Sequence, residues 1–435
     1  MSWQEEYQRK LTTPEKAVKA VPSGDVVYVG TCTSVAYALT NALGERQEEL
    51  EDVTLTCSQI INPVTALDNR KPGAIKLCSY FMGAQERPFM KTGMLDFTSV
   101  HLSQVDIFCR ETMPSNVAFL EVSPPDENGY MNYGASGVAL HTYIKRSAQK
   151  VIVEVNRQVP YVYGTENLIH VSEVAAIVES DIPLFERPSL PFSEEISTIS
   201  DFLLDQIPDG ACIQLGIGGV ADAVGYGLKN KNDLGAHTEL LTDSMMELMR
   251  EGVITNARKS FMPGKSVACF SLGTRALYDF IDRNPDVYFM PFPMSNDCRV
   301  IAQNDNMISI NTAMCVDLFG QVVADNIAGV QFSGTGGQLD FVRGAQMSRG
   351  GKSFIAITSS FVSKKSGRNS RIVSRLPLGA AVTTPRSDVQ YVVTEYGCVN
   401  LKPLTMKQRA HALVGLAHPD YRAQLAEDAR QMGLW

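Results

Sequence analysis

Glu239 lies in the chain between two glycine-rich segments, a combination suited to covalent chemistry on an acyl group. The segments are Gly216-Ile217-Gly218-Gly219 before it and Ser333-Gly334-Thr335-Gly336-Gly337-Gln338 after it. A carboxylate can attack a thioester carbonyl only if the oxyanion is stabilised, and backbone N–H groups of a glycine loop do this without side-chain bulk. The pattern predicts Glu239 as nucleophile, with Gly336, Gly337 and the Gln338 amide as oxyanion donors.

Two carboxylates compete for the role of nucleophile. Glu239 precedes Leu240 and Leu241, and apolar neighbours would desolvate it, sharpen its nucleophilicity and raise its pKa. Most glutamates are solvated surface residues, which is the alternative for Glu239. Glu395 ends an apolar run and precedes Gly397, also a good place for a catalytic group in an open parallel sheet. We assign Glu395 a supporting role, with a buried structural glutamate as the alternative.

The first glycine segment also fits a dinucleotide-binding pattern. Residues 216–221 read G-x-G-x-x-A, and Glu239 follows at about the distance of a ribose-binding carboxylate. An NAD-dependent dehydrogenase is therefore the rival from a different class, and a plain strand-to-helix turn is the structural alternative. The rival is weakened because the motif lies behind a complete α/β half and because it leaves residues 333–338 unexplained.

Metal and serine chemistry find little support in the sequence. Nine cysteines are scattered singly, without a C-x-x-C pair, and most of the six histidines are isolated from one another. No metal is predicted, and the cysteines are interpreted as buried thiols in a reducing cytoplasm. A G-x-S-x-G elbow is absent, which disfavours serine-centred hydrolysis.

Charge and composition restrict the class of partner. The 435-residue chain has a formal charge of −8 and a pI near 5.4, which argues against a general nucleic-acid or membrane-surface role. Its first ten residues are polar where a signal peptide needs an apolar run, and no stretch approaches the ~18 apolar residues of a membrane span. We expect a soluble cytoplasmic protein.

An internal repeat predicts two similar halves. The segment V-P-S-G-D-V-V-Y-V-G at 21–30 recurs as I-P-D-G-A-C-I-Q-L-G at 207–216, and in both a turn leads into a short apolar strand, a glycine and a helical stretch. Two chance strand-loop-helix units are the alternative. The proline-rich segment 180–191 suits a linker, so we predict domains at 1–185 and 186–435.

Strand-like and helix-like segments alternate along the chain. Runs rich in β-branched residues at 150–155, 307–310 and 389–394 alternate with helical patterns at 243–251 and 405–417. Alternation of this kind predicts an α/β protein of two open domains, each with a largely parallel sheet flanked by helices.

Several motifs together resemble the acetyl-CoA hydrolase/transferase family, in its branch of butyryl-CoA:acetate and 4-hydroxybutyrate CoA-transferases. The resemblance covers nearly the whole chain. Its motifs are S-P-P-D-E-N-G-Y at 123–130, E-V-N-R-Q-V-P at 154–160, Q-L-G-I-G-G at 214–219, H-T-E at 237–239, residues 333–344, T-E-Y-G at 394–397 and A-H-P-D at 417–420.

The resemblance implies an activity and a set of site residues. The family has two related α/β domains with the CoA thioester bound between them, and Glu239 matches its nucleophile, which becomes a glutamyl-CoA thioester. Gln214 lies in the motif before the first glycine loop and is expected to support the site. The positions matching CoA-lining residues are Gly216, Ile217, Gly218, Gly219, Val220, Met314 and Gly336.

The implied ligands are acyl-CoA and short-chain carboxylic acids, with coenzyme A as substrate and covalent intermediate and no tightly bound cofactor. Ala221 stands where the family commonly has proline, and residues 292–297 replace a Pro-Val-Asp-Tyr-like segment, so substrate choice is open. Butyryl-CoA with acetate is the first expectation; 4-hydroxybutyrate CoA transfer and acetyl-CoA hydrolysis are alternatives, and a non-catalytic CoA-binding protein is a further one. Oligomeric state is also open, although symmetric self-assembly is the common default.

Overall fold

The computed structural model describes residues 1–188 and 191–435, which form two compact units. The first unit comprises residues 1–188, 241–243 and 267–295. The second comprises the described residues of 189–240, together with 244–266 and 296–435. The predicted linker 180–191 includes residues 189–190, which lie outside the described residues, and its part at 181–188 contains no helix or strand. The boundary at 185/186 stays a prediction, although residues 267–295 pack with the first unit.

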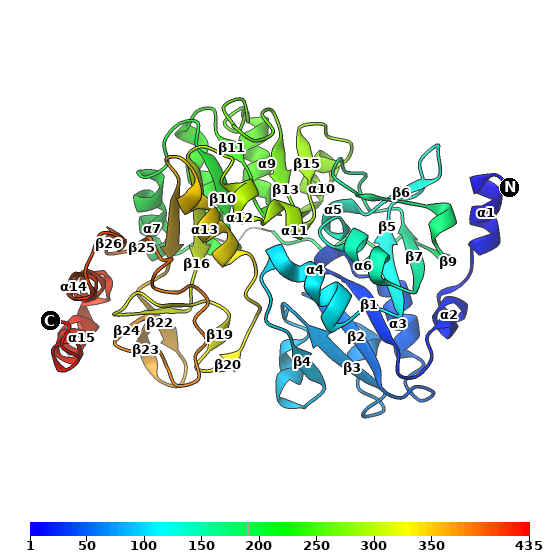
Figure 1. Cartoon of the computed structure of the whole chain (residues 1–435), viewed down its shortest axis with the longest axis horizontal. Helices are drawn as coiled ribbons and strands as arrows, with labels where there is room; N and C mark the ends of the chain where they lie inside the picture. The colour runs from blue at the N-terminus through cyan, green and yellow to red at the C-terminus, as the bar shows by residue number, and fades with distance from the viewer. Residues whose placement is uncertain (189–190) are drawn as a thin grey trace. The chain divides into compact units, whose positions relative to one another are not determined.

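The first unit is built on a seven-stranded parallel sheet with the strand order β4-β3-β2-β1-β5-β7-β9 (Figure 1). Its central strands are apolar and buried along most of their length, as expected for a parallel sheet covered on both faces. The strands are β1 (Val26–Thr31), β2 (Val53–Ser58), β3 (Ile75–Ser79), β4 (Leu95–Phe97), β5 (Val117–Val122), β7 (Lys150–Asn156) and β9 (Ala176–Ser180).

The longer helices of the first unit are short for an α/β protein. They are α1 (Trp3–Lys10), α3 (Tyr37–Gly44), α6 (His141–Ser147) and α10 (Arg275–Ile281). A buried apolar cluster joins α3 to strands β1, β2 and β3 and forms the core beneath this sheet. A two-stranded antiparallel pair, β6 (Tyr130–Asn132) and β8 (Leu168–His170), lies outside the sheet.

The second unit has a six-stranded sheet with the order β11-β10-β16-β21-β25-β26, parallel except for the last strand. The strands are β10 (Cys212–Leu215), β11 (Gly235–Ala236), β16 (Met307–Thr312), β21 (Lys352–Ala356), β25 (Tyr391–Thr394) and β26 (Gly397–Asn400). The principal helices are α7 (Glu194–Leu204), α8 (Gly219–Gly227), α9 (Asp243–Arg250), α13 (Gln338–Met347), α14 (Met406–Leu416) and α15 (Pro419–Gln431). This architecture confirms the predicted α/β class with largely parallel sheets.

The two sheets share a central strand order. In the first, β1 lies between β2 and β5, and in the second, β10 lies between β11 and β16. Both β1 and β10 follow a turn with a glycine at positive φ, Gly24 (φ +83°) and Gly210 (φ +75°), which only glycine adopts readily. The internal repeat therefore coincides with equivalent strands of two similar sheets.

In each sheet the strand order reverses next to the repeated strand. Connections leave in opposite directions from β10 and β16 in the second unit, and the carboxyl ends of strands at such a reversal point are where open α/β sheets bind ligands. In the part of the chain that the structure describes, no helix is long and apolar enough to cross a membrane.

Candidate active site

Glu239 lies three residues beyond β11, at the carboxyl edge of the second unit's sheet. The strand before it is firmly held: the Ala236 N–H donates to Asn256 Oδ1 at 2.9 Å, and the Ala236 carbonyl accepts from Lys259 Nζ at 2.9 Å. The buried Thr238 hydroxyl donates to the Leu240 carbonyl at 3.1 Å across the turn. These bonds fix the direction in which Glu239 leaves the sheet.

The Glu239 carboxylate receives two hydrogen bonds from this unit. Asn296 Nδ2 donates to Oε2 at 2.8 Å, and the Gly337 N–H also donates to the carboxylate. Asn296 is completely buried, whereas Glu239 keeps partial contact with solvent. The carboxylate is thus held on one side by neutral donors and remains reachable on another.

The electrostatic setting raises the pKa of Glu239 to about 7. Desolvation is the largest cause, and the nearby Asp340 carboxylate adds to it, while the hydrogen bonds from Asn296 and Gly337 act in the opposite direction. Near neutral pH a substantial fraction is ionised, and an anion so poorly solvated is a stronger nucleophile than a surface glutamate. The rise in pKa agrees with the expectation drawn from Leu240 and Leu241.

Gly337 is required by shape as well as by its N–H. A Cβ atom added at this position would overlap with Glu239 Oε2 and with Asn296 Nδ2. The preceding Gly336 has φ +62°, in the left-handed region, and both glycines are buried. The second glycine segment therefore lies against Glu239 itself, at the N-terminus of α13.

Gln338 was predicted as a further oxyanion donor, and its carboxamide is held within the protein at both ends. Nε2 donates to the Thr312 carbonyl at 2.7 Å, and Oε1 accepts from the Thr384 hydroxyl at 3.1 Å. These contacts tie the start of α13 to the end of β16. Gln338 follows Gly336 and Gly337 directly and is held in place by these contacts, and its part as an oxyanion donor stays a prediction.

The predicted CoA-lining positions gather at the reversal point of the second unit's sheet. Residues 216–218 connect β10 to α8, Gly219 and Val220 begin that helix, and Met314 follows β16, the neighbouring strand. The Gly216 N–H donates to the Ile310 carbonyl at 3.0 Å, whereas Ile217 is 43% exposed. Gly218 (φ +116°) and Gly219 have no side chain to cover the first N–H groups of α8, which suits an anionic ligand.

Gln214 and Asn311 pair on adjacent strands directly below this loop. Gln214 Nε2 donates to Asn311 Oδ1 at 3.4 Å, and Asn311 Nδ2 donates back to Gln214 Oε1 at 3.2 Å. Both side chains are buried. The reciprocal amide pair ties the ends of β10 and β16 together, and a supporting role for Gln214 in the site stays a prediction.

Glu395 is placed in the turn between β25 and β26 and is engaged by Ser359. Its Oε2 accepts from the Ser359 N–H at 2.8 Å, and its Oε1 accepts from the Ser359 hydroxyl at 2.5 Å. Both carboxylate oxygens therefore already have partners in the loop after β21. This arrangement favours a supporting role for Glu395.

Asn296 is the site residue that sequence reasoning did not select. It lies within residues 292–297, noted only as a departure from the family pattern, and is 57 positions from Glu239. The neighbouring His237 is also buried, between Phe261 and Phe341, with Nδ1 3.1 Å from Asn304 Nδ2. Among the described residues, no group of three or more histidine, cysteine or acidic side chains is arranged to hold a metal ion.

Comparisons with known proteins cover the chain from end to end. Residues 1–184 match the acetyl-CoA hydrolase/transferase N-terminal domain, and residues 273–429 match the C-terminal domain. The chain is 39% identical to butyryl-CoA:acetate CoA-transferase of Anaerostipes caccae, over 100% of this chain and 99% of the relative. It is also 39% identical to 4-hydroxybutyrate coenzyme A transferase of Clostridium kluyveri, over 99% of this chain and 100% of the relative.

A solved structure has the same fold as this chain. RipA from Yersinia pestis is 38% identical and superposes with a TM-score of 0.93, covering 100% of both chains.

Proposed function

The chain belongs to the acetyl-CoA hydrolase/transferase family, and from this premise we propose that it transfers coenzyme A from a short-chain acyl-CoA to a free carboxylate through a thioester on Glu239. Its full-length relatives are CoA-transferases, so the class of reaction is acyl-CoA:carboxylate CoA transfer. The observation that carries the role of Glu239 is its carboxylate, held by Asn296 and Gly337 at a pKa of about 7.

In the first half of the reaction, ionised Glu239 attacks the thioester carbonyl through Oε1, the oxygen that Asn296 does not bind. The C–S bond breaks, the CoA thiolate leaves with the electron pair, and an acyl-glutamyl anhydride forms. The thiolate then attacks Cδ of Glu239 and expels the acyl group as a carboxylate. Glutamyl-CoA thioester remains, which conserves the thioester free energy for the acceptor acid.

The hydrogen bond from Asn296 has a specific role in the second of these steps. When the thiolate attacks Cδ, negative charge develops on the carbonyl oxygen of the glutamyl group, which corresponds to Oε2. Asn296 Nδ2 lies 2.8 Å from Oε2, within the range for an oxyanion donor, and the Gly337 N–H donates to the same carboxylate. We therefore propose that these two donors serve the glutamyl oxyanion, while Gly336 and the segment before it serve the acyl group.

The substrate pair is the finer part of the proposal. Butyryl-CoA with acetate is our first choice, following the relative from Anaerostipes caccae, and 4-hydroxybutyrate is the alternative, following the relative from Clostridium kluyveri. Hydrolysis would require water to reach the glutamyl thioester. The rate at which free CoA is released in the absence of an acceptor acid therefore measures hydrolysis. The dehydrogenase alternative has no counterpart among these relatives.

The test is to trap the intermediate. The protein is incubated with butyryl-CoA without acceptor and reduced with borohydride, and the tryptic peptides 232–250 and 387–407, which contain Glu239 and Glu395, are analysed by tandem mass spectrometry. We expect thioester-dependent reduction of Glu239 to the alcohol, and none in Glu239→Gln. Reduction of Glu395 in its place would move the nucleophile, and an unmodified protein would contradict covalent catalysis.

A further inference from the structure

A cavity of about 320 Å³ lies entirely within the first unit, at the carboxyl ends of three neighbouring parallel strands. Pro124 and Pro125 follow β5, Val155 and Arg157 lie at the end of β7, and Glu179 lies at the end of β9. This is the edge at which open α/β sheets bind ligands. The cavity shares no residue with the Glu239 site, and two of the family motifs, at 123–130 and 154–160, line it.

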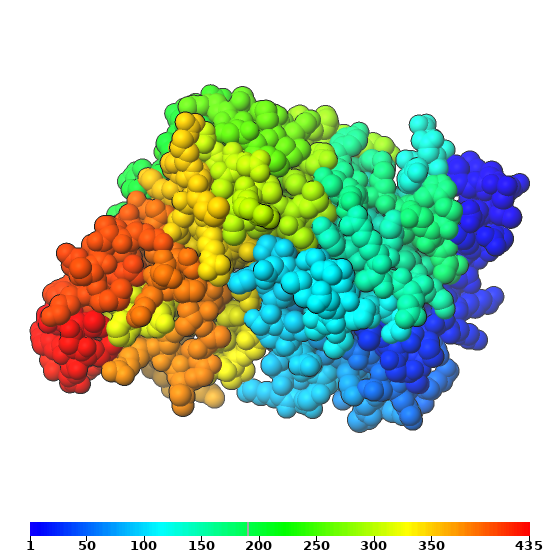
Figure 2. Space-filling view, viewed as in Figure 1, coloured from blue at the N-terminus to red at the C-terminus, as the bar shows by residue number. Residues whose placement is uncertain are grey.

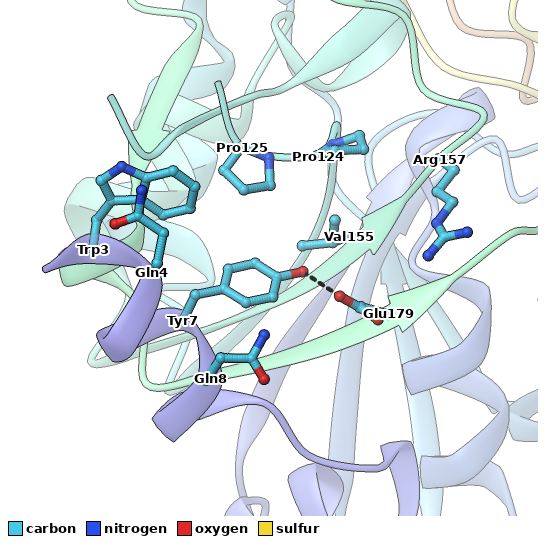
Figure 3. Close-up of a pocket in the computed structure, with 9 residues that line it drawn as sticks. All are labelled: Trp3, Gln4, Tyr7, Gln8, Pro124, Pro125, Val155, Arg157 and Glu179. Carbon is cyan, nitrogen blue, oxygen red and sulfur yellow. Dashed lines mark hydrogen bonds between the residues drawn. The ribbon is translucent and has the colours of Figure 1, made fainter. Parts of the chain in front are cut away.

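Helix α1 closes the other side of the cavity with Trp3, Tyr7 and two glutamines (Figure 3). The helix lies on the surface of the first unit, where Figure 2 shows its residues in dark blue beside the green-cyan segment. It is fixed in place: Trp3 Nε1 donates to the Glu127 carbonyl at 3.1 Å, and Lys10 Nζ donates to the Val171 carbonyl at 2.8 Å. Gly129 packs so closely on Trp3 that a Cβ there would collide with the indole. The aromatic wall is therefore preformed.

The floor of the cavity holds a neutral hydrogen bond beside a negative charge. The Tyr7 hydroxyl donates to Glu179 Oε1 at 2.8 Å. Burial and the hydrogen bond to Glu179 raise the pKa of Tyr7, so the hydroxyl stays protonated as a donor. Glu179 Oε1 is occupied by this bond, and Glu179 is the one acidic residue of the cavity lining.

Arg157 is the one positively charged residue of the cavity lining. Within residues 1–188 and 191–435, its guanidinium forms no hydrogen bond and no ion pair, and Figure 3 likewise draws no hydrogen bond to it. Figure 3 shows Arg157 and Trp3 on opposite sides, with Tyr7 and Glu179 between them. A molecule in the cavity would have its anionic end at Arg157 and its apolar part near Trp3 and the prolines.

We propose that this cavity is a second binding site, for a small organic monocarboxylate, distinct from the Glu239 site. A guanidinium pairs with a carboxylate through two parallel hydrogen bonds, and the indole, prolines and Val155 offer an apolar surface to a short hydrocarbon body. The lining carries one positive and one negative charge, so a phosphate dianion would face Glu179 without compensation. The proposal does not depend on the role of Glu239.

The chain offers a direct optical test, because Trp3 and Trp435 are its two tryptophans. Trp435 stacks on His411 in the second unit, and Trp435→Phe keeps an aromatic ring there and leaves Trp3 as the single tryptophan reporter. The full-length W435F protein is titrated with sodium butyrate at constant ionic strength, and Trp3 emission is recorded. We expect a saturable change, which persists in W435F/E239A.

Two charge variants of the cavity should act in opposite directions. Arg157→Gln should weaken butyrate binding about ten-fold or more, because a charge-assisted pair is lost. Glu179→Gln keeps an acceptor for Tyr7 and removes the negative charge, so it should tighten binding. Arg110→Gln is the matched control: it removes an exposed arginine of the same unit outside the cavity and should leave the titration unchanged. Unchanged melting temperatures will show that the variants fold.

Isothermal titration calorimetry of the same proteins counts the sites independently of fluorescence. The proposal is overturned if neither method detects saturable butyrate binding, or if R157Q binds as tightly as its parent. It is also overturned if inorganic phosphate saturates the Trp3 signal at lower concentration than butyrate, because the site would then prefer inorganic anions.

Discussion

Asn296 Nδ2 lies 2.8 Å from Glu239 Oε2, so a completely buried amide holds one oxygen of the carboxylate at the edge of the sheet. This donor favours the ionised form, whereas desolvation favours the protonated form, and desolvation is the stronger influence. The balance leaves the pKa of Glu239 at about 7, where both forms coexist at neutral pH.

Removing the Asn296 amide should shift the pH dependence of catalysis. In Asn296→Ala, the ionised form loses a hydrogen bond worth about 1.5–3 kcal/mol, so the pKa of Glu239 should rise by about one unit or more. kcat/KM for butyryl-CoA, measured from pH 5.5 to 9, should then have its acid limb at higher pH. The oxyanion donor is lost as well, so the plateau should also be lower. The control is Asn369→Ala, in the hairpin of β22 (Ser360–Ser363) and β23 (Gly367–Ser370). An acid limb that does not shift in N296A would contradict the role of Asn296 in stabilising the ionised Glu239.

Gly337→Ala tests the close approach of the second glycine segment. The added methyl group would overlap with Glu239 Oε2 and Asn296 Nδ2, so the carboxylate must move or the N–H must turn away. Loss of an oxyanion donor typically costs about 100-fold or more in kcat, and we expect at least this loss together with absence of the trapped adduct. Gly415→Ala in α14 has open space around the new methyl group and should retain activity.

A stability measurement gives an independent view of the Glu239 environment. Because its folded pKa of about 7 is above the ordinary glutamate value of 4.5, Glu239 costs the folded state free energy as pH rises from 4.5 to 7, and the cost is constant above 7. Glu239→Gln removes this cost. We expect the variant to gain up to about 3 kcal/mol over the parent protein at pH 8 and little at pH 4.5.

Denaturant unfolding at the two pH values measures this difference. An equal effect of Glu239→Gln at both would show that the carboxylate is not desolvated in the folded protein. Glu247→Gln, on α9 in the same unit, is a matched control, since it removes a carboxylate elsewhere.

The sequence was informative where chemistry and shape are encoded locally. The glycine segments at 216–219 and 333–338 indicated close backbone approach, and the structure places the second beside Glu239 and the first at the reversal point of the sheet. The apolar β-branched run at 150–155 predicted β7, because a parallel strand buried on both faces needs such residues.

The features that the sequence did not reveal depend on contacts between segments that are far apart in the chain. Asn296 has no distinguishing local pattern, and its amide is functional only because residues 57 positions apart fold together. Residues 267–295 pack with the first unit although they come late in the chain, so a single boundary could not be deduced from linker composition. Gln338 was predicted by its place in a glycine loop, but its partners Thr312 and Thr384 are far away in sequence.

The Glu395→Gln variant tests whether the Glu395 carboxylate has a structural role or takes part in the reaction. Glu395 accepts two hydrogen bonds from Ser359, one from the backbone N–H and one from the hydroxyl. A glutamine keeps one acceptor oxygen and loses the charge, so we expect about 1–2 kcal/mol lower stability. The glutamyl-CoA adduct on Glu239 should still form within about ten-fold of the normal rate. The substitution at Glu395 can influence Glu239 only indirectly, through the edge of the sheet. Single-turnover trapping with butyryl-CoA measures that rate, and Ser359→Ala should reproduce the loss of stability. An adduct that fails to form in a stably folded E395Q protein would instead assign Glu395 a direct part in the reaction.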